Sequence, residues 1–285
     1  MINAVVLDVD GVIVGEREGF NFPDPNNAVI DSLKKLRQSG IFVSLCTGRP
    51  AFGIKEIISS AYLNNLHITE GGAVGIDTID KQVSFQYSLD RKKILEMVRF
   101  YLKNDIYIEF YTSTDYFVLK SQVNDLTRKH AIVLQREPQL IDDIAPLLKA
   151  NDIVKILLAS EFDTGKNLII STFNNKFGKE LDLNWTMNAN LLPWKFALVT
   201  LNGVSKRKGV ENISKFLKVP LENILGVGDT MHDWQFIEIC GYGATLEGSD
   251  KKLMELVSKK NERGFIGGNV NENGILDILK HFGLI

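Results

Sequence analysis

The N-terminal stretch constrains this chain most, because an apolar run there leads directly into Asp8, Val9, Asp10 and Gly11. Such a run, bounded by a turn residue, is typical of a buried strand in a parallel sheet, and we expect it to span residues 4–12. Side chains alternate along a strand, so Asp8 and Asp10 share one face while the strand persists. Two close carboxylates repel each other unless a cation lies between them or one is protonated. The stretch indicates a metal site, a phosphate-handling site or both; the alternative is a strand end with two solvated turn aspartates.

Strand and helix patterns alternate through the first and last thirds of the chain, which predicts a parallel sheet with right-handed crossovers. In the first part we expect a helix over residues 26–39, a strand over 41–45, a helix over 51–63, a strand over 67–70 and a hairpin of 73–76 with 83–87. In the last part we expect strands over 196–201, 224–227 and 242–245 and helices over 205–217, from 229 to about 240, 250–258 and 274–282.

Between residues 89 and 193 the pattern changes to one typical of antiparallel strands, with segments rich in aromatic and β-branched residues joined by a polar turn. We expect helices over 90–103, 121–130 and 163–177 and strands over 106–111, 116–119, 153–158 and 183–187. The sequence therefore predicts an α/β protein. Its core is Rossmann-like, with a parallel sheet built from residues 1–88 and 194–285, and residues 89–193 form a separate α+β domain inserted into it.

Several polar side chains follow the predicted parallel strands: Asp8, Asp10, Thr47 and Asp229. Ligands of open parallel sheets bind at the carboxyl ends of the strands, so we expect these side chains to meet at one edge. Mg²⁺ prefers carboxylate oxygens, water and phosphate. Asp8 and Asp229 are natural ligands for it, and Asp233 is either a further ligand or a residue that orients one.

Two further segments suit an anion. Thr47 and Gly48 lie between a strand and a helix, where a hydroxyl and backbone N–H groups can hold phosphate oxygens; the alternative is a tight turn with a helix cap. Lys206, Arg207 and Lys208 lie in the first turn of a predicted helix, where each cation opposes the helix dipole. A bound phosphate would offset this cost, and we favour Lys206 as the residue that reaches it, although a single such cation usually points to solvent.

Composition restricts the partners. The net charge of −2 and the pI near 6.1 give no basic excess that would attract nucleic acid or an anionic membrane. Two cysteines, Cys46 and Cys240, are too few for a disulfide framework, and we expect both to be reduced in the core of a cytoplasmic protein. No segment has the pattern of a signal peptide or a membrane span.

Four segments resemble, in order, the four motifs of the haloacid dehalogenase (HAD) superfamily. They are Asp8–Val12, Cys46–Pro50, Gly203–Lys206 and Gly228–Asp233. The segment Glu70–Ala73 and the long insertion look like the Cof-type branch of that superfamily, which consists of Mg²⁺-dependent phosphatases with a large α/β cap.

The resemblance implies a role for each matching residue. Asp8 would be the nucleophile that forms an aspartyl-phosphate, and Asp10 would protonate the leaving alcohol and then activate water. Mg²⁺ would be held by Asp8, the backbone carbonyl of Asp10 and Asp229, and Asp233 would support the metal or Lys206.

The phosphoryl group would be bound by Thr47, Gly48 and Lys206. Arg49 would contact substrate or cap, with a surface ion pair as the alternative. The fourth motif departs from the family pattern, because Thr230 and His232 replace its Gly and Asn. His232 would donate to the phosphate or narrow the leaving-group pocket, and the alternative for this lone histidine is a packing or surface role.

We therefore expect a Mg²⁺-dependent phosphomonoesterase that acts on a small phosphate ester, in particular a sugar phosphate, as a monomer or homodimer. One alternative is a phosphomutase or phosphotransferase on the same scaffold. Another is a module that keeps the fold and binds ligand without turnover.

Overall fold

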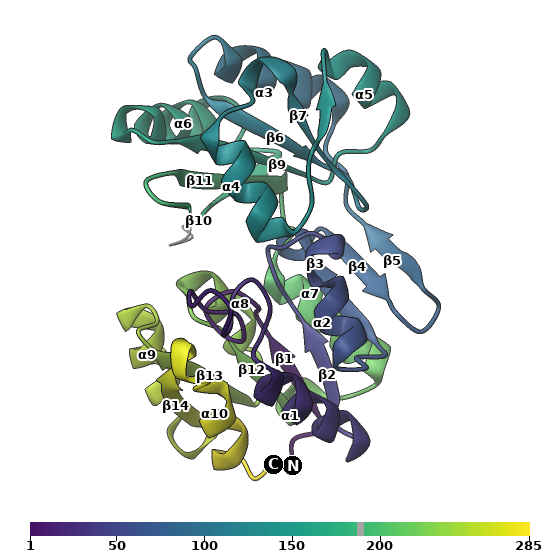
Figure 1. The fold of residues 1–285 in the computed structure, drawn as a ribbon, viewed down its shortest axis with the longest axis vertical. Coiled ribbons are helices and arrows are strands. Elements are labelled where there is room, and N and C mark those ends of the chain that lie inside the picture. Colours follow the sequence, from purple (N-terminus) through teal and green to yellow (C-terminus); the bar gives the residue numbers. More distant parts are fainter. Residues whose placement is uncertain (187–190) are drawn as a thin grey trace. The chain divides into compact units, whose positions relative to one another are not determined.

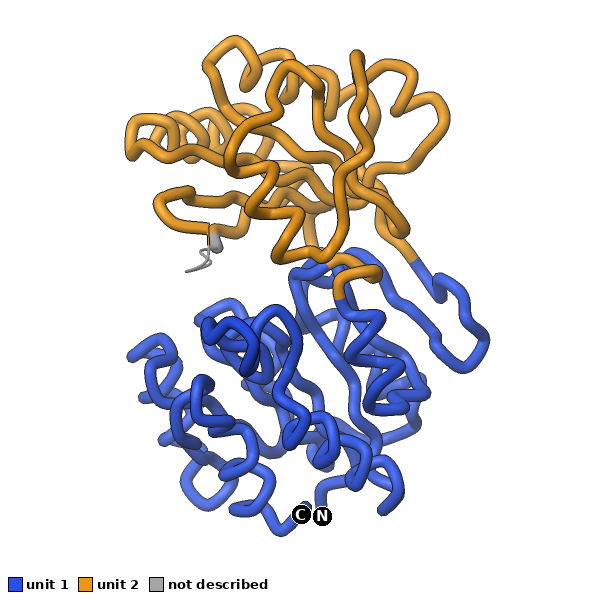
Figure 2. Tube along the Cα trace, viewed as in Figure 1, with its two compact units in different colours: residues 1–49, 54–85, 205–285 blue, residues 50–53, 86–204 orange. Residues whose placement is uncertain are grey.

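The computed structural model describes residues 1–186 and 191–285, and the chain divides into two compact units (Figure 2). Unit 1 comprises residues 1–49, 54–85 and 205–285, and unit 2 comprises residues 50–53 and 86–204. The α/β class is confirmed, since unit 1 holds a parallel sheet and unit 2 a largely antiparallel one. Within the described ranges, every helix is too short or too polar to cross a membrane.

Unit 1 is built on a five-stranded parallel sheet with the order β14-β13-β12-β1-β2 (Figure 1). Its strands are β1 (Ala4–Leu7), β2 (Phe42–Leu45), β12 (Ile224–Val227), β13 (Tyr242–Glu247) and β14 (Gly264–Asn269). We did not predict β14. Three of its six residues are glycines, which are depleted in strands, so pairing with β13 rather than local propensity forms this strand.

Helices cover both faces of this sheet, because its strands are apolar on both sides. In β1, Val5 and Leu7 face one layer while Ala4 and Val6 face the other. The first layer contains α1 (Asn27–Gln38), α2 (Lys55–Ser60) and α10 (Ile275–His281). The second contains α7 (Lys206–Leu217), α8 (Met231–Ile237) and α9 (Lys251–Ser258).

A separate three-stranded sheet has the order β3-β4-β5, with β3 at Leu66–Thr69, β4 at Val74–Asp77 and β5 at Gln82–Gln86. The expected hairpin is present as β4 and β5. The strand predicted over residues 67–70 is present as β3, which pairs antiparallel with β4, while a single parallel bridge from Cys46 to Ile68 links it to the chain after β2. The cause is local: Glu70 and Gly71 have φ values of 53° and 67°, which reverse the chain.

Unit 2 is a six-stranded sheet with the order β10-β11-β9-β6-β7-β8, antiparallel except between β7 and β8. Its strands are β6 (Tyr107–Tyr111), β7 (Tyr116–Leu119), β8 (Gln139–Ile141), β9 (Lys155–Ser160), β10 (Leu181–Thr186) and β11 (Lys195–Leu201). The apolar face is covered by α3 (Arg91–Leu102), α5 (Ile144–Ala150) and α6 (Asp163–Lys176). Helix α4 (Asp125–Leu134) contacts the opposite, polar face through Thr127 and His130.

One predicted strand lies in a different sheet from the one expected. We placed residues 196–201 in the parallel sheet, but β11 pairs antiparallel with β9 and β10. Its Ala197 and Val199 belong to the apolar core of unit 2, so unit 2 continues to Val204, past the residue where we expected the insertion to end. The strand predicted over 183–187 corresponds to β10, and Met187 lies outside the described residues.

Candidate active site

The two N-terminal aspartates lie just beyond β1, which is shorter than the predicted strand of residues 4–12. The strand ends at Leu7, and a turn follows in which Gly11 has a φ of 74° and its N–H donates to the Val14 carbonyl. Asp8 is buried, and its Oδ1 accepts a hydrogen bond from the backbone N–H of Val9 at 2.7 Å. The turn therefore fixes Asp8 at the carboxyl end of β1, which lies between β12 and β2 in the sheet of unit 1.

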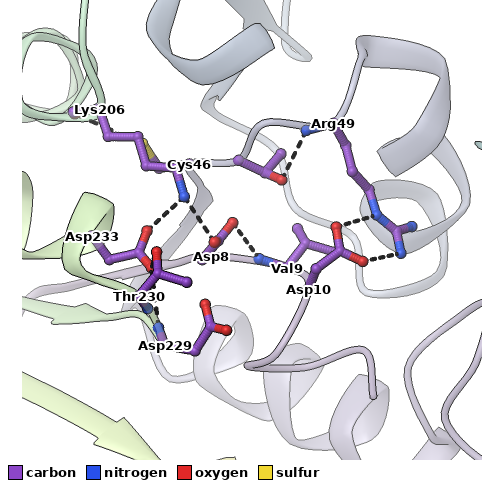
Figure 3. Close-up of polar contacts among 10 residues, drawn as sticks. Asp8, Val9, Asp10, Cys46, Arg49, Lys206, Asp229, Thr230 and Asp233 are labelled. Atoms are coloured by element: carbon purple, nitrogen blue, oxygen red, sulfur yellow. Dashed lines mark hydrogen bonds and ion pairs between the residues drawn. The ribbon is translucent and has the colours of Figure 1, made fainter. Parts of the chain in front are cut away.

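Lys206 joins two of the acidic residues at this edge (Figure 3). Its Nζ lies 2.7 Å from Asp8 Oδ2 and 2.5 Å from Asp233 Oδ1. The Ser205 side chain caps α7, so Lys206 is the first helical residue. Of the three consecutive cations, Lys206 turns inward with 11% of its side chain exposed, whereas Arg207 and Lys208 are about half exposed. Burial acts to lower the pKa of Lys206, but Asp233 and Asp8 outweigh it and hold this pKa above its ordinary value.

Asp233 accepts several hydrogen bonds that order the loop between β12 and α8. Its Oδ2 accepts hydrogen bonds from the backbone N–H groups of Asp229 and Thr230 and from the Thr230 hydroxyl. Burial acts to raise the pKa of Asp233, but Lys206 and the Thr230 hydrogen bonds outweigh it, so this pKa lies below its usual value. Both of its oxygens are therefore occupied by donors from the chain.

Asp8, Asp229 and Asp233 each offer a carboxylate oxygen, and these three oxygens lie within 4.8 Å of one another. Burial raises the pKa of Asp8 to about 7, with Asp233 and Asp10 adding to the effect against Lys206. Burial, followed by the charges of Asp233 and Asp8, also raises the pKa of Asp229 well above its usual value. A divalent cation would favour the ionised forms of these groups, and hard oxygens are the donors that Mg²⁺ prefers. The donor set therefore fits a hard divalent cation.

Arg49 holds Asp10 in a bidentate ion pair (Figure 3). The Arg49 Nε lies 2.9 Å from Asp10 Oδ2, and its Nη2 lies 2.7 Å from Asp10 Oδ1. The Arg49 side chain is 3% exposed and that of Asp10 is 42% exposed, so a buried guanidinium holds a carboxylate that solvent reaches. Burial acts to lower the pKa of Arg49, but Asp10 outweighs it and holds this pKa above its usual value. Fork-to-carboxylate pairing of this kind fixes orientation as well as distance.

The loop after β2 is held by backbone bonds. The Thr47 hydroxyl is buried and accepts from the Arg49 N–H at 3.1 Å. The N–H groups of Glu70 and Gly71 donate to the carbonyls of Arg49 and Thr47, respectively. Residues 70–71 thus fix a loop that lies more than twenty positions earlier in the chain.

Gly48 and His232 are the two remaining residues that we predicted for phosphate binding, and both are half-buried. Gly48 follows Thr47 in the loop after β2. His232 lies in the first turn of α8, beside Asp233 in sequence.

Two glycines matter for a reason that sequence analysis missed. A Cβ on Gly11 would lie 2.1 Å from Asp229 Oδ2, and one on Gly72 would lie 2.5 Å from the carbonyl oxygen of Ser205. Gly11 thus lets the Asp229 carboxylate approach the turn after β1, and Gly72 lets the start of α7 approach the segment after β3. Glycines beside motif residues signal such close approaches, but the partner is known only from the fold.

Comparison with known proteins places this chain in a family. The model of the haloacid dehalogenase-like hydrolase family matches residues 5–279. The chain is 21% identical over 285 residues to the Bacillus subtilis 5-amino-6-(5-phospho-D-ribitylamino)uracil phosphatase YcsE, covering 99% of this chain and 96% of YcsE.

Solved structures show the same fold. A haloacid dehalogenase-like hydrolase from Bacteroides thetaiotaomicron superposes with a TM-score of 0.82 at 16% identity, covering 99% of this chain and all of that one. The HAD subclass IIB sugar phosphatase BT4131 superposes with a TM-score of 0.78 at 18% identity, with 99% of each chain covered.

Fold and site together define a haloacid dehalogenase-like hydrolase, and the chain belongs to that family. Within the family it is a HAD-type phosphatase of the Cof-type branch, which acts on phosphorylated substrates.

Proposed function

We propose that this chain is a Mg²⁺-dependent phosphomonoesterase that hydrolyses a sugar or polyol phosphate through an aspartyl-phosphate intermediate. The observation that carries the proposal is the position of Lys206 Nζ, 2.7 Å from Asp8 and 2.5 Å from Asp233. A buried cation beside a buried carboxylate supports this proposal, because the mechanism needs a nucleophile and a stabilising charge at one point.

Asp8 attacks phosphorus, forming the Oδ–P bond as the bond to the leaving alcohol breaks, and water then hydrolyses the acyl phosphate. Asp10 protonates the leaving oxygen in the first step and takes a proton from water in the second. The bidentate contact with Arg49 holds the Asp10 carboxyl group in one orientation. Each of its oxygens has a second lone pair, and one of these carries the proton that Asp10 gives to the leaving oxygen and later takes from water.

Asp8, Asp229 and the backbone carbonyl of Asp10 would hold Mg²⁺, which would supply charge neutralisation for the transferring phosphoryl group. Asp233 supports this set, because its oxygens accept from Lys206, the Thr230 hydroxyl and two backbone N–H groups. It thereby orients Lys206 and the loop that carries Asp229.

Thr47, Gly48 and Lys206 bind the phosphoryl oxygens, and His232 bounds the leaving-group side. Unit 2 serves as the cap that selects the rest of the substrate. The sugar or polyol class is supported by two similar proteins: YcsE carries a phosphoribityl substrate in its name, and BT4131 is described as a sugar phosphatase.

The test is phosphate release from a panel of sugar phosphates, polyol phosphates, nucleotides and an aryl phosphate, with Mg²⁺ or with EDTA. We expect release with Mg²⁺ only, and a loss of at least about 10³-fold in Asp8→Asn, since the nucleophile is removed. Asp31→Asn, which changes an exposed aspartate of α1, is the matched control and keeps full activity. Undiminished hydrolysis by Asp8→Asn, or equal rates with and without Mg²⁺, would contradict the proposal.

A further inference from the structure

Residues 50–53 belong to unit 2, although the residues on both sides of them belong to unit 1 (Figure 2). This tetrapeptide directly follows Arg49. Its aromatic residue, Phe52, stacks on Tyr116 of β7 with ring centroids 5.7 Å apart and planes 23° from parallel. The chain thus enters unit 2 for four residues immediately after the arginine that holds Asp10.

The stack continues into the sheet of unit 2. Tyr116 stacks on Tyr111 of β6, with centroids 5.5 Å apart and planes 17° from parallel. Cations lie against the two outer members of the series, with Arg136 Cζ 4.7 Å from the Phe52 centroid and Lys155 Nζ 3.9 Å from the Tyr111 centroid. Offset stacking and cation–π contacts are both attractive, so these contacts stabilise the series of three rings in unit 2.

Hydrogen bonds fix the two tyrosines in their orientations. The Tyr116 hydroxyl donates to the Arg136 carbonyl at 2.6 Å, and the Tyr111 hydroxyl donates to the buried carboxylate of Glu109. Tyr111 and Tyr116 are both about 1% exposed. Phe52 therefore packs on a platform whose rings cannot readily reorient.

The path from Phe52 back to Asp10 is short and stiff. Pro50 has a fixed φ, and its carbonyl accepts from the Gly53 N–H at 2.9 Å, which closes a turn around Phe52. Arg49 precedes Pro50 and holds both carboxylate oxygens of Asp10. A displacement of the tetrapeptide is therefore carried through one peptide bond to Arg49 and through two hydrogen bonds to Asp10.

We propose that Phe52 is a positioning residue, which acts through Arg49 to hold Asp10 in the orientation for proton transfer. The proposal rests on the role of Asp10 in the proposed function. It assigns to the aromatic series a task in the chemistry, beyond packing unit 2.

Proton transfer distinguishes this role from a structural one. An alkyl phosphate has a poor leaving group that needs a general acid, whereas an aryl phosphate such as p-nitrophenyl phosphate leaves without one. A residue that acts through Asp10 therefore affects the alkyl ester more than the aryl ester. A residue that merely stabilises unit 2, or that acts on phosphate binding, affects both substrates alike.

The experiment measures kcat/KM for Phe52→Ala on the best alkyl phosphate and on p-nitrophenyl phosphate, because kcat/KM reports the step in which the leaving group departs and omits the hydrolysis step that both esters share. A general acid contributes roughly 10²–10⁴-fold, so we expect its partial misplacement to lower kcat/KM for the alkyl ester by about tenfold more than for the aryl ester. Phe52→Tyr keeps a ring on Tyr116 and restores the wild-type ratio. Asp10→Asn calibrates the assay, because it removes the acid itself.

Phe100→Ala is the matched control. Phe100 is also a half-buried ring of unit 2, lies 5.3 Å from the Tyr101 centroid and has Lys176 Nζ 4.9 Å from its own centroid, but it lies on α3. It should leave the alkyl-to-aryl ratio unchanged. Equal losses on both substrates in Phe52→Ala, or the same change of ratio in Phe100→Ala, would overturn the inference. An unchanged ratio in Asp10→Asn would instead overturn the proposed role of Asp10 and the inference with it.

Discussion

Lys206 and Asp8 are separated by 198 positions in sequence, yet their side chains meet at 2.7 Å in the interior of unit 1. Tertiary structure creates this pair: β1 supplies Asp8, and the first turn of α7 supplies Lys206. Because Lys206 is shared with Asp233, its removal leaves two buried carboxylates without their common cation. That arrangement gives the first prediction.

Lys206→Met should lower kcat/KM for phosphate ester hydrolysis by roughly 10²–10³-fold, since a preorganised charge at the reacting group is lost. Steady-state kinetics at saturating Mg²⁺ measure this fall in kcat/KM. Lys208→Met, two residues further along the same helix, is the control; its side chain is 46% exposed and should be dispensable. Comparable losses in the two variants would show that general electrostatic attraction, not the Asp8 contact, is responsible.

Gly11→Ala should weaken Mg²⁺ activation. The added methyl group would lie 2.1 Å from Asp229 Oδ2, and the φ of 74° is unfavourable for alanine. We expect the Mg²⁺ concentration for half-maximal activity to rise by about tenfold or more, because Asp229 must move. Gly19→Ala also has a positive φ, 72°, but meets no atom within 4 Å, so it controls for backbone strain alone. The prediction fails if both variants show the same Mg²⁺ dependence.

Glu109→Gln should destabilise unit 2. Glu109 is fully buried, and its carboxylate accepts from the Tyr107 and Tyr111 hydroxyls and contacts His130 Nδ1 at 2.9 Å. Replacing one carboxylate oxygen by an amide NH₂ leaves a buried donor without its acceptor, which costs about 1–3 kcal/mol and more where the acceptor is charged, so we expect a loss of about 2–4 kcal/mol.

Urea unfolding followed by the emission of Trp185 and Trp194, with Trp234 replaced by Phe, measures this loss in unit 2. Glu161→Gln, at an exposed position of the same unit, should change the free energy of unfolding by less than about 0.5 kcal/mol. A Glu109→Gln protein as stable as wild type would show that the carboxylate charge is unimportant to unit 2.

Unit 1 should lose stability below pH 6.5 because of His67. Burial lowers the pKa of His67 to about 4, and its ring accepts from the Leu45 N–H and bonds to the Leu63 carbonyl, each at 3.0 Å. The unfolded chain binds the proton more readily, so stability is complete above pH 6.5 and falls as the pH is lowered toward 4. From these values we expect a loss of about 2 kcal/mol between pH 7 and pH 4.5.

Urea unfolding at both pH values, followed by Trp234 emission with the other two tryptophans replaced by Phe, measures the effect in unit 1. His67→Gln should reduce the pH dependence by that amount, whereas His281→Gln, at an exposed position, should leave it unchanged. An identical pH dependence in wild type and His67→Gln would exclude His67 as its source.

The sequence analysis succeeded where a residue's chemistry and its place at a strand end coincide. Asp8, Asp229 and Asp233 could be grouped from the strands that precede them, and their oxygens lie together in the structure. It did not predict which sheet each strand joins. The apolar pattern of β11 suits a strand of either unit, and only its pairing with β9 and β10 shows that it belongs to unit 2. Nor could it find the burial of Arg49 or its pairing with Asp10, because an arginine beside a turn is equally compatible with solvent.

The membership of residues 50–53 in unit 2 bears on any attempt to exchange specificity between relatives. A graft that replaced only residues 86–204 would leave Phe52 facing a foreign sheet, without Tyr116 to stack on. The segment next to Arg49 would then pack on a sheet that its sequence does not match. A graft that carries residues 50–53 together with residues 86–204 would keep Phe52 and Tyr116 in contact.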